Sequence, residues 1–283
     1  MSDCVVCNNK INFKEKFEIL KQCKVCDHIF ADIKLDENEI KNIYSDKYFF
    51  GNEYINYIED KKQIKKNSLI RLISIKKYLT NFAHKNIYEI GCAYGFFLDT
   101  VKKNFDKVSG IDVNQEAINY ASKTLNLDVN CGNFLNVESN ILEQYNIFCM
   151  FDVIEHLQEP NKFIKRINDY SQKDSLLIIT TGDIGSFNAK INGKNWRLIH
   201  PPSHIHYFSK KTITKLLNNN GFEVLSINHC GYYRNFSFIL NKIKFLTKYF
   251  GFFIKILKFF KILNLDIYLN LFDIMFIVAK KQD

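Results

Sequence analysis

Several features that mark particular protein classes are missing from this chain of 283 residues. Every apolar run long enough to cross a bilayer contains lysine, and no secretory hydrophobic segment opens the chain, so we expect a cytoplasmic protein. The Gly-x-Gly-x-x-Gly fingerprint is absent, which argues against a nicotinamide-linked oxidoreductase. Acidic residues are absent between Val224 and Leu265. The net charge of +9 fits either genomic composition or attraction to phosphates and anionic membranes.

The eight cysteines fall into two groups of four. One group forms the pattern Cys-x2-Cys-x15-Cys-x2-Cys near the N-terminus: Cys4, Cys7, Cys23 and Cys26. This spacing predicts a zinc ribbon over residues 1–35, with four thiolates around one tetrahedral ion. A cytoplasmic setting disfavours the alternative of two disulfides. Because the four thiolates fill the coordination shell, the ion should be structural. The other four cysteines are scattered and should pack as small apolar residues.

A strand, a glycine turn and a helix follow one another in the middle of the chain. Residues 86–90 are typical of a buried strand, 91–95 of a tight turn and 96–101 of a helix. Such a turn lets backbone N–H groups approach a ligand without obstruction by Cβ atoms. Glu89 lies two places before the first glycine, and Asp112 ends the next predicted strand. An acid at that strand end can accept hydrogen bonds from a ribose diol, so the pattern suggests an adenosyl cofactor.

The turn resembles the cofactor signature of class I S-adenosylmethionine-dependent methyltransferases: Glu89-x-Gly91-x-x-x-Gly95 followed by Asp112. Residues 151–157, with Asp-Val-Ile-Glu-His, resemble the motif after strand 4 in the branch that includes sugar methyltransferases. Residues 196–209 resemble that branch's segment before its late helix, and the zinc ribbon resembles the one that opens some sugar methyltransferases. The resemblance covers roughly residues 46–230 and departs at Ala93, where the family usually has glycine.

The resemblance implies an α/β fold: a Rossmann-like, seven-stranded sheet with the last strand antiparallel. Further apolar runs at 145–151, 175–181, 222–228 and 272–280 fit its later strands. We expect the zinc ribbon at 1–35, a helical segment at 36–82 that covers the cofactor site, and the methyltransferase domain at 83–283. A basic, aromatic helical insertion is expected at 232–273, before the last strand.

S-adenosyl-L-methionine is the cofactor that the resemblance implies. The residues that would bind it are Glu89, Gly91, Ala93, Gly95, Asp112, Val113, Asn133, Phe134 and Asp152. By resemblance, Asn133 would bond the exocyclic amine of adenine, and Phe134 would lie against the ring. Glu89, Asp112 and Asp152 all follow or end predicted parallel strands, whose carboxyl ends share one edge of the sheet.

Transfer of a methyl group to a hydroxyl requires a positioned acceptor, exclusion of water and removal of one proton. Histidine, with a pKa of about 6.5, suits the last task. We expect the base to be His204, then His206, then His156; in an extended segment His204 and His206 share a face. By resemblance, His156 lines the active site. A divalent metal site made by these histidines and Glu155, like that of one methyltransferase branch, is an alternative.

The favoured function is O-methylation of a sugar, a nucleotide-linked sugar or a related surface-polysaccharide precursor. A small-molecule substrate is thus the expected partner. The alternatives are an RNA methyltransferase that grips phosphates with the ribbon and lysines, a C- or N-methyltransferase of another metabolite, and a non-catalytic cofactor-binding protein. Nucleic acid is disfavoured, because residues 152–155 replace the Asn-Pro-Pro-aromatic motif of base methylation. Residues 235–263 either contact the cytoplasmic face of a membrane or pack as a helical pair.

Overall fold

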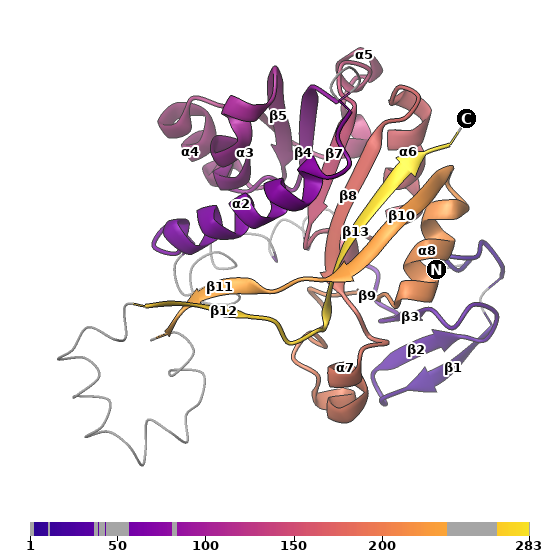
Figure 1. Ribbon diagram of the computed structural model, residues 1–283. Helices are drawn as coiled ribbons and strands as arrows, with labels where there is room; N and C mark the ends of the chain where they lie inside the picture. The colour runs from indigo at the N-terminus through magenta and orange to yellow at the C-terminus, as the bar shows by residue number, and fades with distance from the viewer. Residues whose placement is uncertain are drawn as a thin grey trace, which may run out of the picture.

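The computed structural model describes residues 3–10, 12–36, 39, 43, 57–80, 84–236 and 265–282. Its centre is a seven-stranded sheet in the order β10-β13-β8-β7-β4-β5-β6 (Figure 1). Strand β13 runs antiparallel to both of its neighbours, whereas β8, β7, β4, β5 and β6 are parallel to one another. The predicted seven-stranded sheet with an antiparallel last strand is therefore confirmed.

The strands of this sheet are β4 (Asn86–Ile90), β5 (Lys107–Asp112), β6 (Asp128–Cys131), β7 (Ile147–Phe151), β8 (Leu176–Gly182), β10 (Phe222–His229) and β13 (Ile274–Lys281). The α-helices are α2 (Lys61–Lys76), α3 (Phe96–Val101), α4 (Gln115–Leu125), α5 (Ser139–Leu142), α6 (Pro160–Tyr170), α7 (Phe187–Asn192) and α8 (Lys210–Asn218). Short 3-10 helices are η2 (Lys102–Asn104), η3 (Phe134–Asn136), η4 (Ile154–His156) and η5 (Gly193–Asn195). The remaining strands are β1 (Phe13–Lys16), β2 (Leu20–Cys23), β3 (Ile29–Phe30), β9 (His206–Tyr207), β11 (Tyr232–Asn235) and β12 (Asp266–Leu269).

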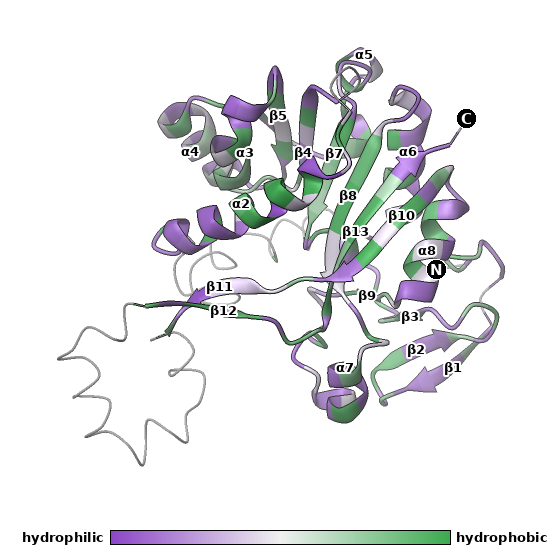
Figure 2. Ribbon diagram, viewed as in Figure 1, coloured by the Kyte–Doolittle hydropathy of each residue, from purple (hydrophilic) through white to green (hydrophobic). Residues whose placement is uncertain are grey.

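Both faces of the central strands are buried, which explains their nearly continuous apolar sequences (Figure 2). Alternate side chains enter different layers, since successive residues of a strand point to opposite faces. Tyr88 and Phe148 pack in the layer that contains α6 and α8. Ile87 and Ile147 pack in the other layer, with α2, α3 and α4. Glu89, two residues after Ile87, is therefore a carboxyl directed into the layer beneath α2.

The N-terminal ribbon packs against the layer that contains α8, and its strand β3 pairs with β9, which lies just before α8. Strand β3 pairs antiparallel with β9, so that Phe30 lies opposite His206 (Figure 1). The Ala31 N–H donates to the Ile205 carbonyl at 2.9 Å, which extends this pairing by one hydrogen bond. On the other side, the amide of Asn219 donates to a ribbon carbonyl at 2.9 Å. The ribbon thus fixes the segment that leads into α8.

The prediction of a helical insertion over 232–273 is wrong at its described ends. Strands β11 and β12 pair antiparallel there and form a separate two-stranded sheet that extends away from the main sheet (Figure 1). The two aromatic residues at the start of β11, Tyr232 and Tyr233, favour an extended strand. Asn67 of α2 fixes β11 by accepting from the Tyr233 N–H at 2.6 Å. The tyrosine-rich stretch at 44–56 and residues 237–264 lie outside the described residues.

The segment between β8 and α8 contains α7, η5 and β9. Ser186 begins α7 by accepting a hydrogen bond from the Ala189 N–H at 3.1 Å. Ser209 caps α8 in a reciprocal arrangement with Thr212. Among the described residues, no helix combines the length and the apolar composition needed to cross a membrane.

Candidate active site

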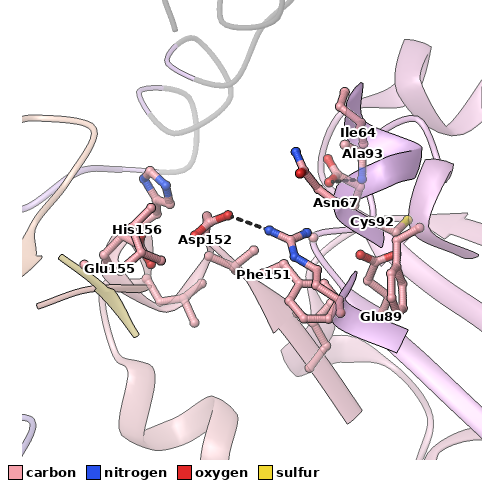
Figure 3. A pocket seen from close by; sticks show the side chains of 18 of the residues that line it. Ile64, Asn67, Glu89, Cys92, Ala93, Phe151, Asp152, Glu155 and His156 are labelled. Carbon is pink, nitrogen blue, oxygen red and sulfur yellow. Dashed lines mark hydrogen bonds and ion pairs between the residues drawn. The ribbon is translucent and has the colours of Figure 1, made fainter. Parts of the chain in front are cut away.

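A cavity of ≈ 500 Å³ opens at the carboxyl ends of β4, β5 and β7. Helix α2, the glycine turn, the ends of these strands and the start of β11 form its walls. Figure 3 shows Glu89 and Cys92 at one end, Glu155 and His156 at the other, and Asp152 between them. Ligands of open α/β sheets bind at this edge, and the volume is that of a small-molecule site. The cavity therefore has two ends with different chemistry.

The glycine turn brings its main chain to the wall of the cavity at two positions. Gly91 has a φ of +75°, and a Cβ there would lie 2.4 Å from a methyl group of Val153. Ala93 has a φ of 45° and donates its N–H to Asp112 at 2.8 Å. Gly95, which was predicted to bind the cofactor, lies outside the cavity wall. A Cβ on Gly95 would lie 2.6 Å from Leu127, so this glycine allows close packing at the start of α3.

Asp112 ends β5 with both carboxylate oxygens bonded to backbone. One oxygen accepts from Ala93 N–H at 2.8 Å and the other from Asn114 N–H at 2.9 Å. Burial raises the pKa of Asp112, although the backbone hydrogen bonds act in the opposite direction. Each oxygen keeps a further lone pair for a ligand. The turn and β5 therefore hold this carboxylate rigidly at the cavity wall, where it was predicted to meet a ribose.

Glu89 is a buried carboxyl in the cavity wall, with a side chain only 4% exposed. Its Oε2 atom has no hydrogen-bond partner among the described residues. Burial raises the pKa of Glu89 well above its usual value; Arg71 opposes this effect and Asp112 adds to it. A buried carboxyl oxygen without a partner is costly, and its retention indicates a ligand with a cationic or donor group.

Arg71 of α2 lines the cavity and was not predicted from the sequence. Its guanidinium donates to Asp152 at 3.0 Å and lies 4.2 Å from the ring centroid of Phe151 (Figure 3). Asp152, at a φ of 57°, also accepts from Thr180 Oγ1 at 2.9 Å. A compositional signal was present: only four of the 39 basic residues are arginines, and three of the four line this cavity. Arginine in a lysine-rich chain indicates a need for its planar, bidentate geometry.

The proposed adenine wall lies between β6 and η3, and Val113, Asn133 and Phe134 all line the cavity there. Phe134 is 2% exposed and stacks on Phe163 with ring centroids 5.6 Å apart. Asn133 caps η3, because its Oδ1 accepts from the Leu135 N–H at 2.9 Å. The predicted bond from adenine to Asn133 therefore has to share an oxygen that is already bonded to the backbone.

At the opposite end, two histidines face each other beside Glu155. The rings of His156 and His204 are 4.5 Å apart between centroids. His156 Nδ1 bonds the Ser203 carbonyl at 2.7 Å, and His204 Nδ1 bonds the Leu198 carbonyl at 3.0 Å. Burial lowers the pKa of His156 to about 4 and that of His204 well below its usual value. Both imidazoles are therefore neutral at physiological pH, and both line the cavity.

His206 is not part of this cavity, which corrects its prediction as a base. Its side chain is 1% exposed, and Nδ1 lies 3.0 Å from Nε2 of His28 in the ribbon. The rings of the two histidines stack with centroids 5.1 Å apart. Because β9 pairs with β3, His206 is directed at the ribbon and cannot share a face with His204 in the cavity. Its contacts are those of a buried structural residue.

Two further arginines flank an aromatic ring in the wall near His204. Arg197 donates to Asp273 at 2.8 Å, and its guanidinium lies 5.9 Å from the centroid of the Tyr232 ring. Arg234 lies 5.2 Å from the same centroid and 3.7 Å from the carboxylate of Asp60. Tyr232 and the two arginines beside its ring all line the cavity. Each arginine thus has a carboxylate neighbour, and Arg197 adds positive charge near His204.

The four ribbon cysteines converge as their spacing predicts. Their sulfur atoms all lie within 4.8 Å of one another, and the Cys4–Cys26 and Cys7–Cys23 distances are 3.6 Å and 3.9 Å. Thiolates at about 2.3 Å from one tetrahedral zinc ion would be about 3.8 Å apart, so the donor set fits such an ion. The same distances are too long for disulfide bonds.

Comparisons with known proteins agree with this geometry. The methyltransferase domain family matches residues 64–227, which is more than half of the chain. The mitochondrial ubiquinone biosynthesis O-methyltransferase of Dictyostelium discoideum is 27% identical over 113 residues; the match covers 34% of this chain and 35% of that enzyme. The chain thus spans about a third of the length of this relative.

Two solved structures share the fold. Magnesium protoporphyrin IX methyltransferase from Synechocystis PCC 6803, with bound SAH, has a TM-score of 0.55 and 12% identity; 87% of this chain and 100% of that chain are covered. A SAM-dependent methyltransferase from Thermotoga maritima has a TM-score of 0.53 and 17% identity, with 83% and 98% covered.

Proposed function

Because the chain belongs to the methyltransferase domain family and is a SAM-dependent methyltransferase, we propose that it O-methylates a nucleotide-linked sugar or a related polysaccharide precursor. The observation that carries the proposal is the division of the cavity into two ends. One end has buried carboxylates and bare main chain, and the other has neutral histidines with fixed arginines. The first suits a cationic adenosyl donor, and the second suits an anionic acceptor that carries a hydroxyl group.

The donor would bind along the glycine turn. Asp112 would hold the ribose diol, the wall beside Phe134 would take the adenine, and the unpartnered Glu89 oxygen would accept from a cationic group. When bound, S-adenosylmethionine supplies a methyl group on a positively charged sulfur. Asp152 lies between the two ends (Figure 3), and together with Arg71, which donates to it, would position the groups that react. A buried carboxyl group whose oxygen has no partner among the described residues, and a backbone-held carboxylate in the same wall, support the binding of this ligand.

The acceptor would bind at the histidine end. His204 and His156 are neutral there, with Nδ1 protons bonded to carbonyls, so Nε2 is the nitrogen that carries the lone pair in each ring. Either ring could bind and help to deprotonate a hydroxyl group. Arg197 and Arg234, fixed by carboxylates around the Tyr232 ring, suit a phosphate or diphosphate group. These arginines favour a nucleotide-linked acceptor over a free sugar.

We further propose that the ribbon binds one structural zinc ion, supported by the four converging sulfur atoms. The ribbon holds β9, which begins two residues after His204. Zinc would therefore stabilise the acceptor end without contacting it. Cytoplasmic location and membrane-surface contact through 235–263 stay predictions, because most of that segment lies outside the described residues.

The test is incubation of the protein with nucleotide-sugar pools and isotopically labelled S-adenosylmethionine, followed by mass spectrometry for a gain of one methyl group. Arg197→Lys should raise the KM of the methylated nucleotide-linked sugar about tenfold or more, because a bidentate charged hydrogen bond is lost. Arg166→Lys is the matched control, since Arg166 lies outside the cavity wall. Equal methylation of free sugars, or equal KM values for both variants, would refute the nucleotide-linked acceptor.

A further inference from the structure

Among the described residues, a second group of metal-binding side chains occurs in addition to the ribbon cysteines. Glu155, His156 and His204 each offer one ligand atom, and these atoms all lie within 4.8 Å of one another. All three residues line the cavity, and Figure 3 shows Glu155 and His156 at the end opposite Glu89 and Cys92. We propose that these three side chains bind a divalent transition-metal ion that receives the hydroxyl group of the acceptor.

The two histidines are prepared as ligands by their backbone contacts. The Ser203 and Leu198 carbonyls accept from Nδ1 of His156 and His204, at 2.7 Å and 3.0 Å. Because a carbonyl can only accept, Nδ1 carries the proton in each ring and Nε2 carries the lone pair. Histidine ligands of metals almost always donate their other nitrogen in this way, which fixes both tautomer and ring orientation.

Glu155 supplies the observation that points to a cation. Its side chain is 4% exposed, and its Oε2 has no hydrogen-bond partner among the described residues. A buried carboxyl oxygen without a partner is costly, and coordination to a cation would satisfy it. The Glu155 carbonyl accepts from the Ile205 N–H at 3.0 Å, which joins η4 to the segment that carries His204.

The spacing and donor types define the class of ion. Ligands at about 2.1 Å from one tetrahedral ion would be about 3.4 Å apart, so small side-chain rotations bring the three donors together. Two imidazoles and one carboxylate suit zinc or iron(II) and disfavour magnesium and calcium, which take oxygen ligands. Three protein ligands leave coordination positions open, as in catalytic sites. His206 is excluded from the ligand set by its burial against His28.

The catalytic role of this metal ion rests on the proposed function. The binding of the ion does not depend on that function. A bound divalent ion acts as a Lewis acid and lowers the pKa of a coordinated hydroxyl group. The hydroxyl proton passes to water, the oxygen forms a bond to the methyl carbon, and the carbon–sulfur bond breaks with its electron pair retained by sulfur. The two histidines then serve as ligands, and direct proton removal by either ring is not needed.

The test is zinc binding by the full-length protein with its ribbon already filled, measured by equilibrium dialysis against zinc and elemental analysis. The parent should hold two zinc ions per chain. Glu155→Gln and His204→Ala should each lower the affinity for the second ion more than about 100-fold, because a ligand is lost. Each variant should therefore hold one zinc ion per chain. His200→Gln is the matched control: its ring lies 3.8 Å from His204 but outside the ligand set, and it should hold two.

The outcomes separate this proposal from the proposed function. A parent that holds one zinc ion, or variants that all hold two, would overturn the metal site. Circular dichroism and calorimetric binding of S-adenosylhomocysteine on the same samples report folding and the cofactor end. Glu155→Gln keeps the shape of the side chain, so it decides the question if His204→Ala fails to fold. If the unmodified protein does not bind S-adenosylhomocysteine, the proposed function is overturned, whether the protein holds one zinc ion or two.

Discussion

Glu89→Gln should make the protein more stable and a weaker binder of its cofactor. The Glu89 pKa is raised in the folded state, so above the ordinary value of about 4.5 the folded chain holds a proton that the unfolded chain has lost. Stability therefore falls as the pH rises from about 4.5 towards the raised folded pKa. Glutamine does not titrate and escapes this loss. The variant should therefore gain stability at pH 8 and little at pH 4.5, and each unit by which the folded pKa of Glu89 is raised corresponds to about 1.4 kcal/mol.

The same change should weaken the binding of S-adenosylmethionine, because the oxygen without a partner is the one that would accept a hydrogen bond from the cationic ligand. A charge-assisted hydrogen bond contributes about 1.5–3 kcal/mol, so Kd should rise about tenfold to 100-fold. Thermal unfolding of the apo protein at several pH values and calorimetric titration with the cofactor measure the two effects. Glu143→Gln, at an exposed position, is the matched control. Unchanged cofactor affinity, or a stability gain equal at pH 4.5 and pH 8, would refute this account of Glu89.

Three other predictions concern the turn, the ribose site and the ribbon. Asp112→Ala should weaken S-adenosylhomocysteine about 100-fold in calorimetry, since it removes two charge-assisted bonds; retained affinity would move the ribose elsewhere. Gly91→Ala should lower the free energy of unfolding by at least about 1 kcal/mol in chemical denaturation, because the new Cβ meets Val153 at a positive φ; an equally stable variant would contradict the tight turn. Cys23→Ser should remove one zinc ion per chain and lower the melting temperature, and an unaltered metal content would argue against the ribbon site.

Local patterns were sufficient to predict the central elements of the fold. The segment 86–101 combines a buried strand, a glycine turn and a helix within sixteen successive positions, and the structure has all three. The antiparallel final strand followed from the family resemblance. The ends of the 232–273 insertion were misjudged, because the pairing of β11 with β12 joins residues more than thirty positions apart. A local helical pattern carries no information about such a partner.

The site shows the same division between local and long-range information. Asp112 and Asp152 line one cavity, as their positions at the ends of neighbouring parallel strands predicted, and their contact with a cofactor stays a prediction. His206 was misassigned, because its environment depends on the pairing of β9 with β3, which lie far apart in sequence. Arg71 was overlooked because α2 precedes the motifs, and only its packing over β7 brings it to Asp152.

The pairing of β3 with β9 also bears on how this protein can be produced. A gene trimmed to the family-matched region, 64–227, would delete β3 and β13 and leave β9 and β8 with open edges that other chains can pair with. The same trimming removes His28, which contacts both His206 and the ring of Phe208, and would expose these two buried side chains. Soluble expression and crystallisation should therefore start from the ribbon-bearing gene, and aggregation of shorter versions would say nothing about the catalytic fold.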